Sequence, residues 1–300
     1  MQEKLEGLLW GSFVADALSL GLHWEYDMDL LQEKFQKISG YVDPRKNSYH
    51  SNKQAGQLTH YGDQALLLLE SIDRNKGFQA DVFSREWQGF FQKYQGYQDH
   101  ATRTTLENLS RGQVFFEAGS HSDELGGSCR IAPLIYYYHK NKKILLEAVK
   151  EQTFLTHNHP LVIESAVFIA RVALKVLSGE APVFAIEDML AQEVANAELS
   201  VIVREGIRSV SMDSASALKK LGQSCALNHA LSGAIHFIVK YEDNLQEALT
   251  MNVLCGGDSA SRGMVIGMIL GCSLGKKAIP DSWMRDLVSG PLLRDFIEHY

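Results

Sequence analysis

The sequence predicts an all-α protein that forms one domain over residues 1–300. Apolar residues recur every three or four positions through nearly all of the hydrophobic stretches, which is typical of helices with one buried face. No stretch shows a convincing alternation of apolar and polar residues, the pattern of a half-buried strand. No linker or internal repeat divides the chain.

The composition is that of an ordinary globular protein and argues against several functional classes. Of the 300 residues, 45% are hydrophobic and 22% are charged, and the formal net charge is -7. The negative charge and the lack of a Lys/Arg cluster argue against nucleic-acid binding. The four cysteines have no CxxC spacing, so we expect reduced core residues. The N-terminus lacks the layout of a signal peptide, and we expect a cytoplasmic location.

Helices are expected along the whole chain, separated by polar or glycine-containing loops. The expected helices cover residues 5–20, 30–38, 65–72, 78–94, 99–111, 144–154, 161–177, 184–208, 214–221, 227–241 and 245–254, and further helices begin near residues 130, 258 and 280. Loops are expected at 21–27, 39–57 and 119–128. The 39–57 loop is long, and loops of that length in compact domains are often functional.

The most informative segment is the glycine pair Gly256-Gly257 with the helix that follows. Asp258 or Ser259 is well placed to cap this helix, and further glycines at 263, 267, 271 and 275 give it a narrow face for close helix packing. The apolar run is too short to cross a membrane, which takes about 20 residues. We therefore expect a buried helix, either simply capped or presenting an aspartate and two hydroxyls at its positive end.

Acidic residues elsewhere suggest that this helix start has a counterpart. Asp16 lies inside an apolar helix and must be paired, hydrogen-bonded or bound to a cation. Asp63 lies at the start of another strong helix, as Asp258 does. If the two helix starts face each other, they form an oxygen-rich site suited to a hard cation. The intervening loop with His23 and Glu25 is either a ligand-contacting loop or a turn with a half-buried tryptophan.

Two further segments are candidate anion sites. The glycine loop at 119–128 precedes an apolar helix, which is the arrangement of many phosphate cradles, although most such loops are only loops. His157 and His159 lie on one turn before Pro160, where they bind a metal or a phosphate, or else only cap the helix or lie at the surface.

Five segments, in this order, together resemble the ADP-ribosylglycohydrolase family, and the resemblance covers nearly the full chain. They are residues 11–18, like the family's Gly-Asp-Ala-Leu helix; 57–70, similar to its Thr-Asp-Asp-Thr segment; 127–134, like the glycine loop ending in Met-Arg-x-Ala-Pro-Leu; 156–160, matching Thr-His-x-His-Pro; and 256–261, resembling Gly-Gly-Asp-Thr-Asp-Thr. The crystallin J1-like proteins of jellyfish lenses belong to the same superfamily and use the fold structurally.

The resemblance implies an orthogonal helical bundle with a two-metal Mg²⁺ or Mn²⁺ site between the two helix starts. It also implies cleavage of ADP-ribose from arginine, serine or related acceptors, through an oxocarbenium-like transition state. This sequence departs from the pattern because only Asp63 and Asp258 remain, one aspartate in each metal segment. We therefore expect at most one weakly held metal ion and otherwise no cofactor. The family's N-terminal glutamate falls at either His23 or Glu25.

The leading hypothesis is a hydrolase acting on an ADP-ribosyl or related glycosidic bond in a small molecule or an ADP-ribosylated protein. The metal or attacking water is held by Asp63 and Asp258, supported by Ser261 and Asp16, and the acid or base is His23 or Glu25. The remaining candidates hold the diphosphate and ribose; they are Gly127, Ser128, Arg130, His157 and His159. In an alternative reading, Arg130 only pairs with a buried carboxylate such as Asp16. A second hypothesis is a non-catalytic ADP-ribose binder or a crystallin-like structural protein.

Overall fold

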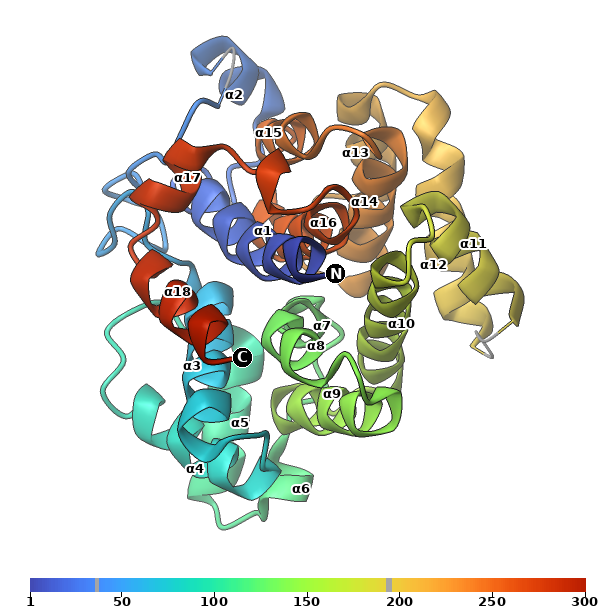
Figure 1. Ribbon diagram of the computed structural model, residues 1–300. Coiled ribbons are helices and arrows are strands. Elements are labelled where there is room, and N and C mark those ends of the chain that lie inside the picture. Colours follow the sequence, from blue (N-terminus) through green and yellow to red (C-terminus); the bar gives the residue numbers. More distant parts are fainter. Residues whose placement is uncertain (36–37, 193–195) are drawn as a thin grey trace.

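The computed structural model describes residues 1–35, 38–192 and 196–300, and over these ranges the protein is helical (Figure 1). Those ranges contain no strand, and only two isolated β-bridges occur, Ser120 with His157 and Glu124 with Ala226. The all-α prediction is therefore confirmed. None of the described helices is both long enough and apolar enough to cross a bilayer.

The helices follow one another with short connections. They are α1 Gln2–Leu20, α2 Met28–Lys34, α3 His60–Asn75, α4 Ala80–Phe91, α5 His100–Ser110, α6 Phe115–Ala118, α7 Gly126–Cys129, α8 Ala132–Tyr138, α9 Lys142–Thr156, α10 Pro160–Leu177, α11 Pro182–Gln192, α12 Ala197–Arg208, α13 Ser214–Leu221, α14 Leu227–Lys240, α15 Leu245–Leu254, α16 Ser259–Leu274, α17 Asp281–Asp286 and α18 Gly290–His299. Short 3-10 turns at Ser209–Ser211 and Lys276–Ala278 complete the set.

Helices α1 and α16 lie side by side at the centre of the molecule (Figure 1). Their contact is a backbone contact, because a Cβ at Gly11 would lie 2.1 Å from the Gly267 carbonyl oxygen, and the reverse distance is also 2.1 Å. Gly7 and Gly271 repeat this arrangement nearer the start of α1. The glycine face expected on α16 is thus the face on which α1 packs.

Side-chain caps explain several of the helix starts. An N-cap carboxylate, hydroxyl or amide accepts a backbone N–H in the first turn, satisfying a donor that the helix itself leaves free. The capping residues are Asp27, Thr59, Asp99, Asn141, Asn196, Asp213 and Asn244. At α16, Asp258 occupies the N-cap position, which is one of the two expected positions, but its side chain makes no capping hydrogen bond.

Most expected helices are present, and the errors lie at breaks within them. The expected helix 30–38 is α2, which ends at Lys34, and residues 36–37 lie outside the described chain. The span 184–208 is two helices, since Asn196 caps the start of α12, and residues 193–195 are not described. The last helix also divides, because Leu287 is extended and α18 begins at Gly290 with Pro291 in its first turn. The short helices α6 and α7 were not expected.

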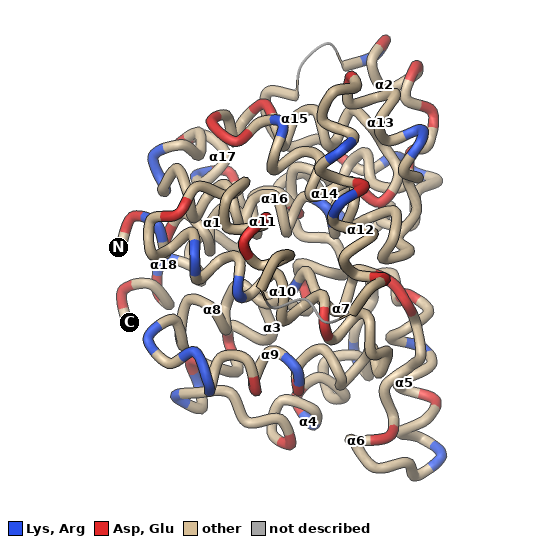
Figure 2. Tube along the Cα trace, turned by 90° about the vertical axis from the view of Figure 1, so that its right-hand side faces the viewer, with Lys and Arg blue, Asp and Glu red and all other residues tan. Residues whose placement is uncertain are grey.

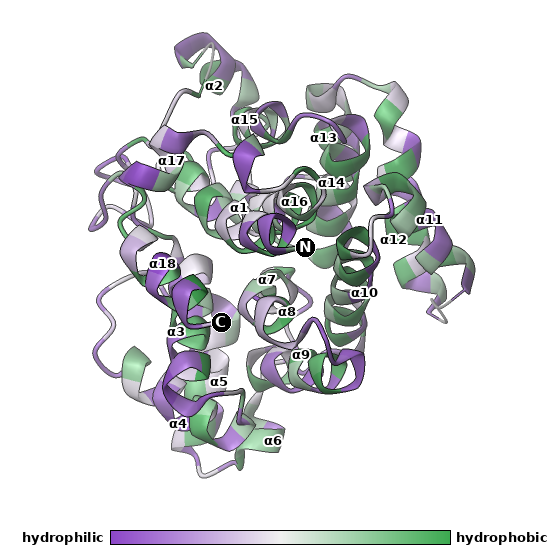
Figure 3. Ribbon diagram, in the orientation of Figure 1, coloured by the Kyte–Doolittle hydropathy of each residue, from purple (hydrophilic) through white to green (hydrophobic). Residues whose placement is uncertain are grey.

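Buried apolar residues form one continuous cluster that runs from Leu5 to Phe296. The central helices α10, α14 and α16 are strongly apolar (Figure 3), whereas most charged residues lie along the outer helices and loops (Figure 2). All four cysteines are unpaired, as expected. A few charged residues in the described chain are nevertheless buried; they are Asp16, Asp99, Arg130, Asp258 and Arg262. Burying charge is costly, so these residues require a separate explanation.

We predict that Gly267→Ala strongly destabilises the protein. Its new methyl group would lie 2.1 Å from the Gly11 carbonyl oxygen, so α1 and α16 would have to separate. The expected loss is about 2–4 kcal/mol in the free energy of unfolding, measured by urea denaturation. Gly89→Ala in α4 is the matched control, because a Cβ there meets nothing within 4 Å. It should leave stability unchanged or raise it by up to about 1 kcal/mol. Equal losses in the two variants would contradict the packing argument.

Candidate functional site

Helix α1 holds the starts of both α3 and α16. The Asp16 carboxylate accepts hydrogen bonds from the Thr59 backbone N–H at 2.7 Å and the Thr59 hydroxyl at 2.6 Å, and Thr59 is the N-cap of α3. One helical turn later, the Ser19 hydroxyl donates to the Ser259 carbonyl oxygen at 3.1 Å. Residues three apart lie on one helix face, so a single face of α1 positions both helix starts.

At the start of α16, the Asp258 carboxylate faces His23. The Nε2 atom of His23 lies 3.4 Å from the Asp258 Oδ1 atom, and both side chains are fully buried. The other oxygen of Asp258 accepts a hydrogen bond from the Ser261 hydroxyl. The Ala260 backbone N–H points at His23 Nδ1 at 3.4 Å, so Nδ1 carries the lone pair and Nε2 the proton of the neutral ring.

Two backbone hydrogen bonds join the loop 21–27 to Gly257, in the glycine pair that precedes α16. The Trp24 N–H donates to the Gly257 carbonyl at 2.9 Å, and the Gly257 N–H donates to the Glu25 carbonyl at 2.6 Å. Both glycines have φ near +65°, and Trp24 itself has a φ of 61°. Such a backbone is strained for tryptophan, and this strain is typical of functional loops. The Glu25 carboxylate forms an ion pair with Arg45.

At the start of α3, Asp63 is bound to two neighbours outside its own helix. Its Oδ2 atom pairs with the Lys53 ammonium group and accepts a hydrogen bond from the Tyr94 hydroxyl. Lys53 comes from the long loop 39–57. Burial raises the pKa of Asp63, and the neighbouring Lys53 opposes that rise.

A second histidine–carboxylate pair lies beside His23 and was not predicted. The His60 Nε2 atom lies 3.5 Å from Asp99 Oδ2, and His60 Nδ1 lies 3.2 Å from His50 Nε2. The ring centroids of His23 and His60 are 6.1 Å apart. Burial lowers the pKa of His50 to about 3 and holds the pKa of His23 and His60 well below the ordinary histidine value. These three rings are therefore neutral at pH 7.

Three aromatic rings lie against this histidine cluster. Trp24, Tyr49 and Tyr97 contact one another with centroid separations of 5.0–5.1 Å. Trp24 also lies 5.7 Å from His50 and 5.4 Å from His60. Tyr49 is largely exposed, whereas the histidines beneath are buried, so the aromatic rings form the solvent-facing side of the cluster.

The predicted anion-binding residues divide into two groups. The Ser128 hydroxyl donates to the Val162 carbonyl at 2.9 Å, and Gly127 packs so closely on His157 that a Cβ would lie 2.7 Å from its ring. Both residues are buried in the one-turn helix α7, so the loop expected at 119–128 ends at residue 125. His157 and His159, in contrast, each retain a ring nitrogen without a hydrogen-bond partner.

Arg130 is also buried, and its partners are neutral. It donates to the Gln64 side-chain oxygen and, at 2.6 Å, to the Thr156 hydroxyl, while its Nε has no partner in the described chain. The alternative in which Arg130 pairs with Asp16 is wrong, because Asp16 bonds to Thr59 and no carboxylate of the described residues forms an ion pair with the guanidinium group. A buried arginine without a carboxylate partner is typical of an anion-binding site.

Buried polar atoms without a hydrogen-bond partner are concentrated in this region. Buried groups are normally satisfied, so such a concentration indicates a place that water or a ligand fills. The unpartnered atoms of the region are His23 Nε2, His60 Nε2, the Tyr61 hydroxyl, Glu124 Oε2, Arg130 Nε, His157 Nε2, His159 Nδ1 and Asp258 Oδ1. Burial raises the pKa of Asp258 to about 6, and burial with the nearby Asp99 and Asp258 charges raises that of Glu124 to about 7.

Comparison with known proteins identifies the family. The ADP-ribosylglycohydrolase family model matches residues 1–300. The chain belongs to the ADP-ribosylglycohydrolase family. A solved structure titled "ADP-ribosylglycohydrolase-related protein complex" superimposes with a TM-score of 0.74 over 99% of this chain and 96% of that one, at 21% identity. At that identity the superposition shows the fold alone.

Three curated relatives align with this chain over nearly the whole length of both sequences. An uncharacterised protein of Archaeoglobus fulgidus is 27% identical, covering 99% of this chain and 94% of the relative. Crystallin J1A of Tripedalia cystophora is 24% identical, covering 94% of this chain and 91% of the crystallin, and crystallin J1B of the same animal is 23% identical, covering 100% and 95%. The family resemblance read from the five motifs is thereby confirmed.

Members of the ADP-ribosylglycohydrolase family are typically metal-dependent, and the residues of this chain do not fit a metal cluster. The four predicted ligands are engaged by protein groups: Asp63 by Lys53, Asp16 by Thr59, and Asp258 by the fourth predicted ligand, Ser261. Among the described residues, no group of three or more His, Cys, Asp or Glu side chains is arranged to hold a metal ion. The structure therefore supports no step that depends on a bound metal.

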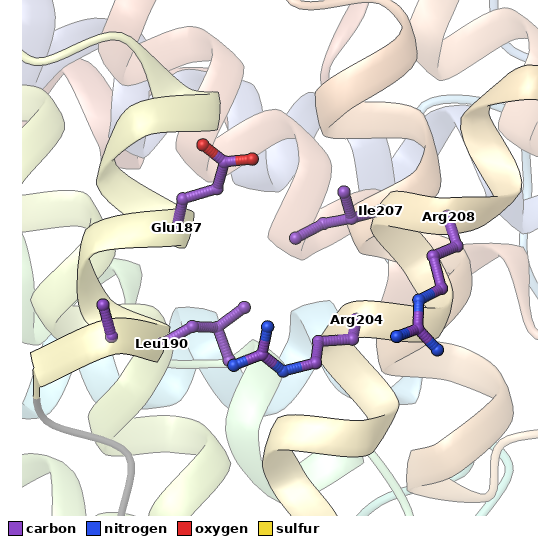
Figure 4. Close-up of a pocket in the computed structure, with 6 residues that line it drawn as sticks. Glu187, Leu190, Arg204, Ile207 and Arg208 are labelled. Carbon is purple, nitrogen blue, oxygen red and sulfur yellow. The ribbon is translucent and has the colours of Figure 1, made fainter.

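A surface pocket elsewhere in the protein is separate from this site. It lies between α11 and α12, and Figure 4 shows Glu187 on one side with Arg204 and Arg208 on the other. Its lining includes none of the residues discussed above.

Sequence reasoning missed the residues that complete the site. Asp99 was interpreted only as the start of a helix, and its capping bond to Thr102 is real, but its second oxygen faces His60. Lys53 and His50 lie in the loop 39–57, for which the only sign of a function in the sequence was its length. Glu124 lies within the glycine loop 119–128, and no spacing rule distinguishes it from a solvated acid. These residues are recognised only from their neighbours in the folded structure.

We predict that Glu124→Gln removes a pH dependence of stability. The carboxyl ionises near pH 4.5 when exposed and near 7 in the fold, so between these values the unfolded chain binds fewer protons. Stability therefore falls as pH rises through that window, by up to about 3 kcal/mol, and is constant above it. Urea unfolding from pH 4.5 to 7.5 should show a smaller fall in the variant than in the parent, because the raised pKa of Asp258 adds its own fall to both. The exposed Glu117→Gln serves as control, and parallel profiles for the parent and Glu124→Gln would refute the assignment.

Proposed function

We propose that this protein hydrolyses an ADP-ribosyl or closely related N- or O-glycosidic bond at the anomeric carbon of the ribose. The observation that carries the proposal is the concentration of unpartnered buried polar atoms around His23, Asp258 and Arg130. Family membership supplies the substrate class, and the bond at issue is one that breaks through an oxocarbenium-like transition state.

The two halves of the site suit the two parts of such a substrate. We assign the diphosphate to Arg130, His157 and His159, which have free donors or acceptors, and Gly127 with Ser128 forms the supporting turn. The ribose then lies toward Asp258, Asp63 and Ser261. An arginine guanidinium suits a diphosphate, since it donates several hydrogen bonds from a fixed plane.

The reacting water is assigned to a position beside the His23–Asp258 pair, within hydrogen-bond reach of both side chains. His23 Nε2–H donates a hydrogen bond to the water, and Asp258 Oδ1 accepts its proton as the water attacks the anomeric carbon and the bond to the acceptor nitrogen or oxygen breaks. The protonated Asp258 then gives this proton to the leaving acceptor, which restores the carboxylate. A pKa near 6 leaves Asp258 mostly ionised at pH 7 but basic enough to accept a proton. Asp16 acts through Thr59 by fixing the start of α3. No step here depends on a bound Mg²⁺ or Mn²⁺ ion.

The proposal assigns the acid–base role to the His23–Asp258 pair and not to Glu25. Asp258→Asn and His23→Ala should each lower kcat by about 100-fold or more, because general acid–base groups contribute on that scale. Glu25→Gln is the control, since its carboxylate pairs with Arg45, and its kcat should stay close to that of the parent. Release of ADP-ribose from ADP-ribosylated arginine and serine peptides provides the measurement. Loss of turnover in Glu25→Gln alone would reverse the assignment.

A second candidate is a non-catalytic ADP-ribose binder or a crystallin-like protein. The relatives crystallin J1A and J1B favour it, as does the loss of half of the metal-segment aspartates. Calorimetric titration with ADP-ribose separates the two candidates when combined with the peptide assay. Binding without turnover would support the binder, and neither binding nor turnover would support the structural role.

A further inference from the structure

We infer that the ammonium group of Lys53 is the resident cation of this site and takes, at Asp63, the place of a divalent metal ion. The inference concerns the site of the proposed function, but its central test does not require ADP-ribose to bind.

The contacts of Lys53 place its charge directly on the carboxylate that the family pattern assigns to a metal. Lys53 Nζ pairs with Asp63 Oδ2, and the same oxygen accepts from the Tyr94 hydroxyl. The Lys53 side chain is only 12% exposed and that of Asp63 17%, so the pair is largely removed from solvent. Lys53 Nζ also lies 5.8 Å from the centroid of the Tyr94 ring, within range of a cation–π interaction.

The loop that carries Lys53 is held in place by its own hydrogen bonds. The Lys53 N–H donates to the His50 carbonyl at 2.9 Å, and the Ala55 N–H donates to the Asp43 carboxylate at 2.7 Å. His50 is itself buried against His60. The ammonium group is therefore positioned by a structured turn and not by a freely moving surface chain.

The carboxylates missing from the metal segments cannot simply be restored in this fold. Gly62 occupies the position of one missing aspartate, and a Cβ there would lie 2.3 Å from the Asp16 Oδ2 atom. Ala260 occupies the position of the other, is fully buried, and donates its N–H to His23. Relative to the family pattern, the site has lost two negative charges and contains one positive side chain, Lys53. The site therefore stays near charge balance without a divalent ion.

An ammonium ion supplies part of what a metal supplies. It provides positive charge and hydrogen-bond donors, so Lys53 with Asp63 suits a vicinal diol such as that of ribose. It cannot act as a Lewis acid toward water, and in the proposed function that task falls to His23 and Asp258.

The test is Mn²⁺ binding, followed by electron paramagnetic resonance and by thermal unfolding in EDTA or Mn²⁺. The parent should show no saturable Mn²⁺ binding at Asp63, and EDTA should not change its melting temperature. Lys53→Glu places a second carboxylate beside Asp63, so it should bind Mn²⁺ at least about tenfold more tightly than the parent. Mn²⁺ should also restore stability that this variant loses in EDTA.

Two further variants separate the role of the ammonium group from a general change in charge. Lys46→Glu changes the net charge equally in the same loop, where Lys46 is exposed, and should gain no Mn²⁺ site. Lys53→Gln removes the charge without adding a ligand, and keeps the test open if Lys53→Glu does not fold. Lys53→Gln should be less stable than the parent and also less stable than Lys46→Gln.

The outcomes that overturn the inference are distinct from failure of the proposed function. Saturable Mn²⁺ binding by the parent that disappears in Asp63→Asn would overturn it, as would equal Mn²⁺ affinity in Lys53→Glu and Lys46→Glu. If the parent neither binds ADP-ribose nor hydrolyses the peptides, the proposed function fails, whereas the Mn²⁺ result still decides the role of Lys53.

Discussion

The backbone contact between α1 and α16 is the constraint on which the rest of the structure depends. Glycines at 11 and 267 allow the two helices to approach until carbonyl oxygens occupy the space that side chains normally fill. Only at this separation can Ser19 reach the Ser259 carbonyl. Asp16, on the same face of α1, then fixes Thr59 and the start of α3. The geometry of the site is therefore set by a packing contact in the core.

The site is built at a cost in stability that the surrounding core offsets. Each buried polar group left without a partner costs about 1–3 kcal/mol, and several such groups lie together here. Desolvation also keeps the histidines neutral and raises the pKa of Asp258 to about 6. The same burial that makes the region unstable gives it groups that exchange protons near neutral pH.

The sequence was sufficient for the fold because helix periodicity and caps are local properties. Pro160 at the first turn of α10 and the glycine spacing of α16 each predicted what the structure contains. The side-chain partners were beyond its reach, because they join segments far apart in the chain. Lys53 with Tyr94 and His60 with Asp99 are pairs of this kind, and no spacing rule relates them. The sequence indicated that one aspartate remains in each metal segment, but it did not indicate that Lys53 pairs with Asp63.

The arrangement of unpartnered atoms also bears on whether the protein is only a structural member of its family. A protein selected for stability alone gains when buried polar groups are paired or replaced by apolar ones. Here Arg130 keeps a free Nε, and His157 keeps a free Nε2, inside a core that is otherwise well packed. Retention of both groups in a buried position is better explained by a ligand that satisfies them than by a packing role. This argument favours a ligand-binding protein even if the catalytic step were lost.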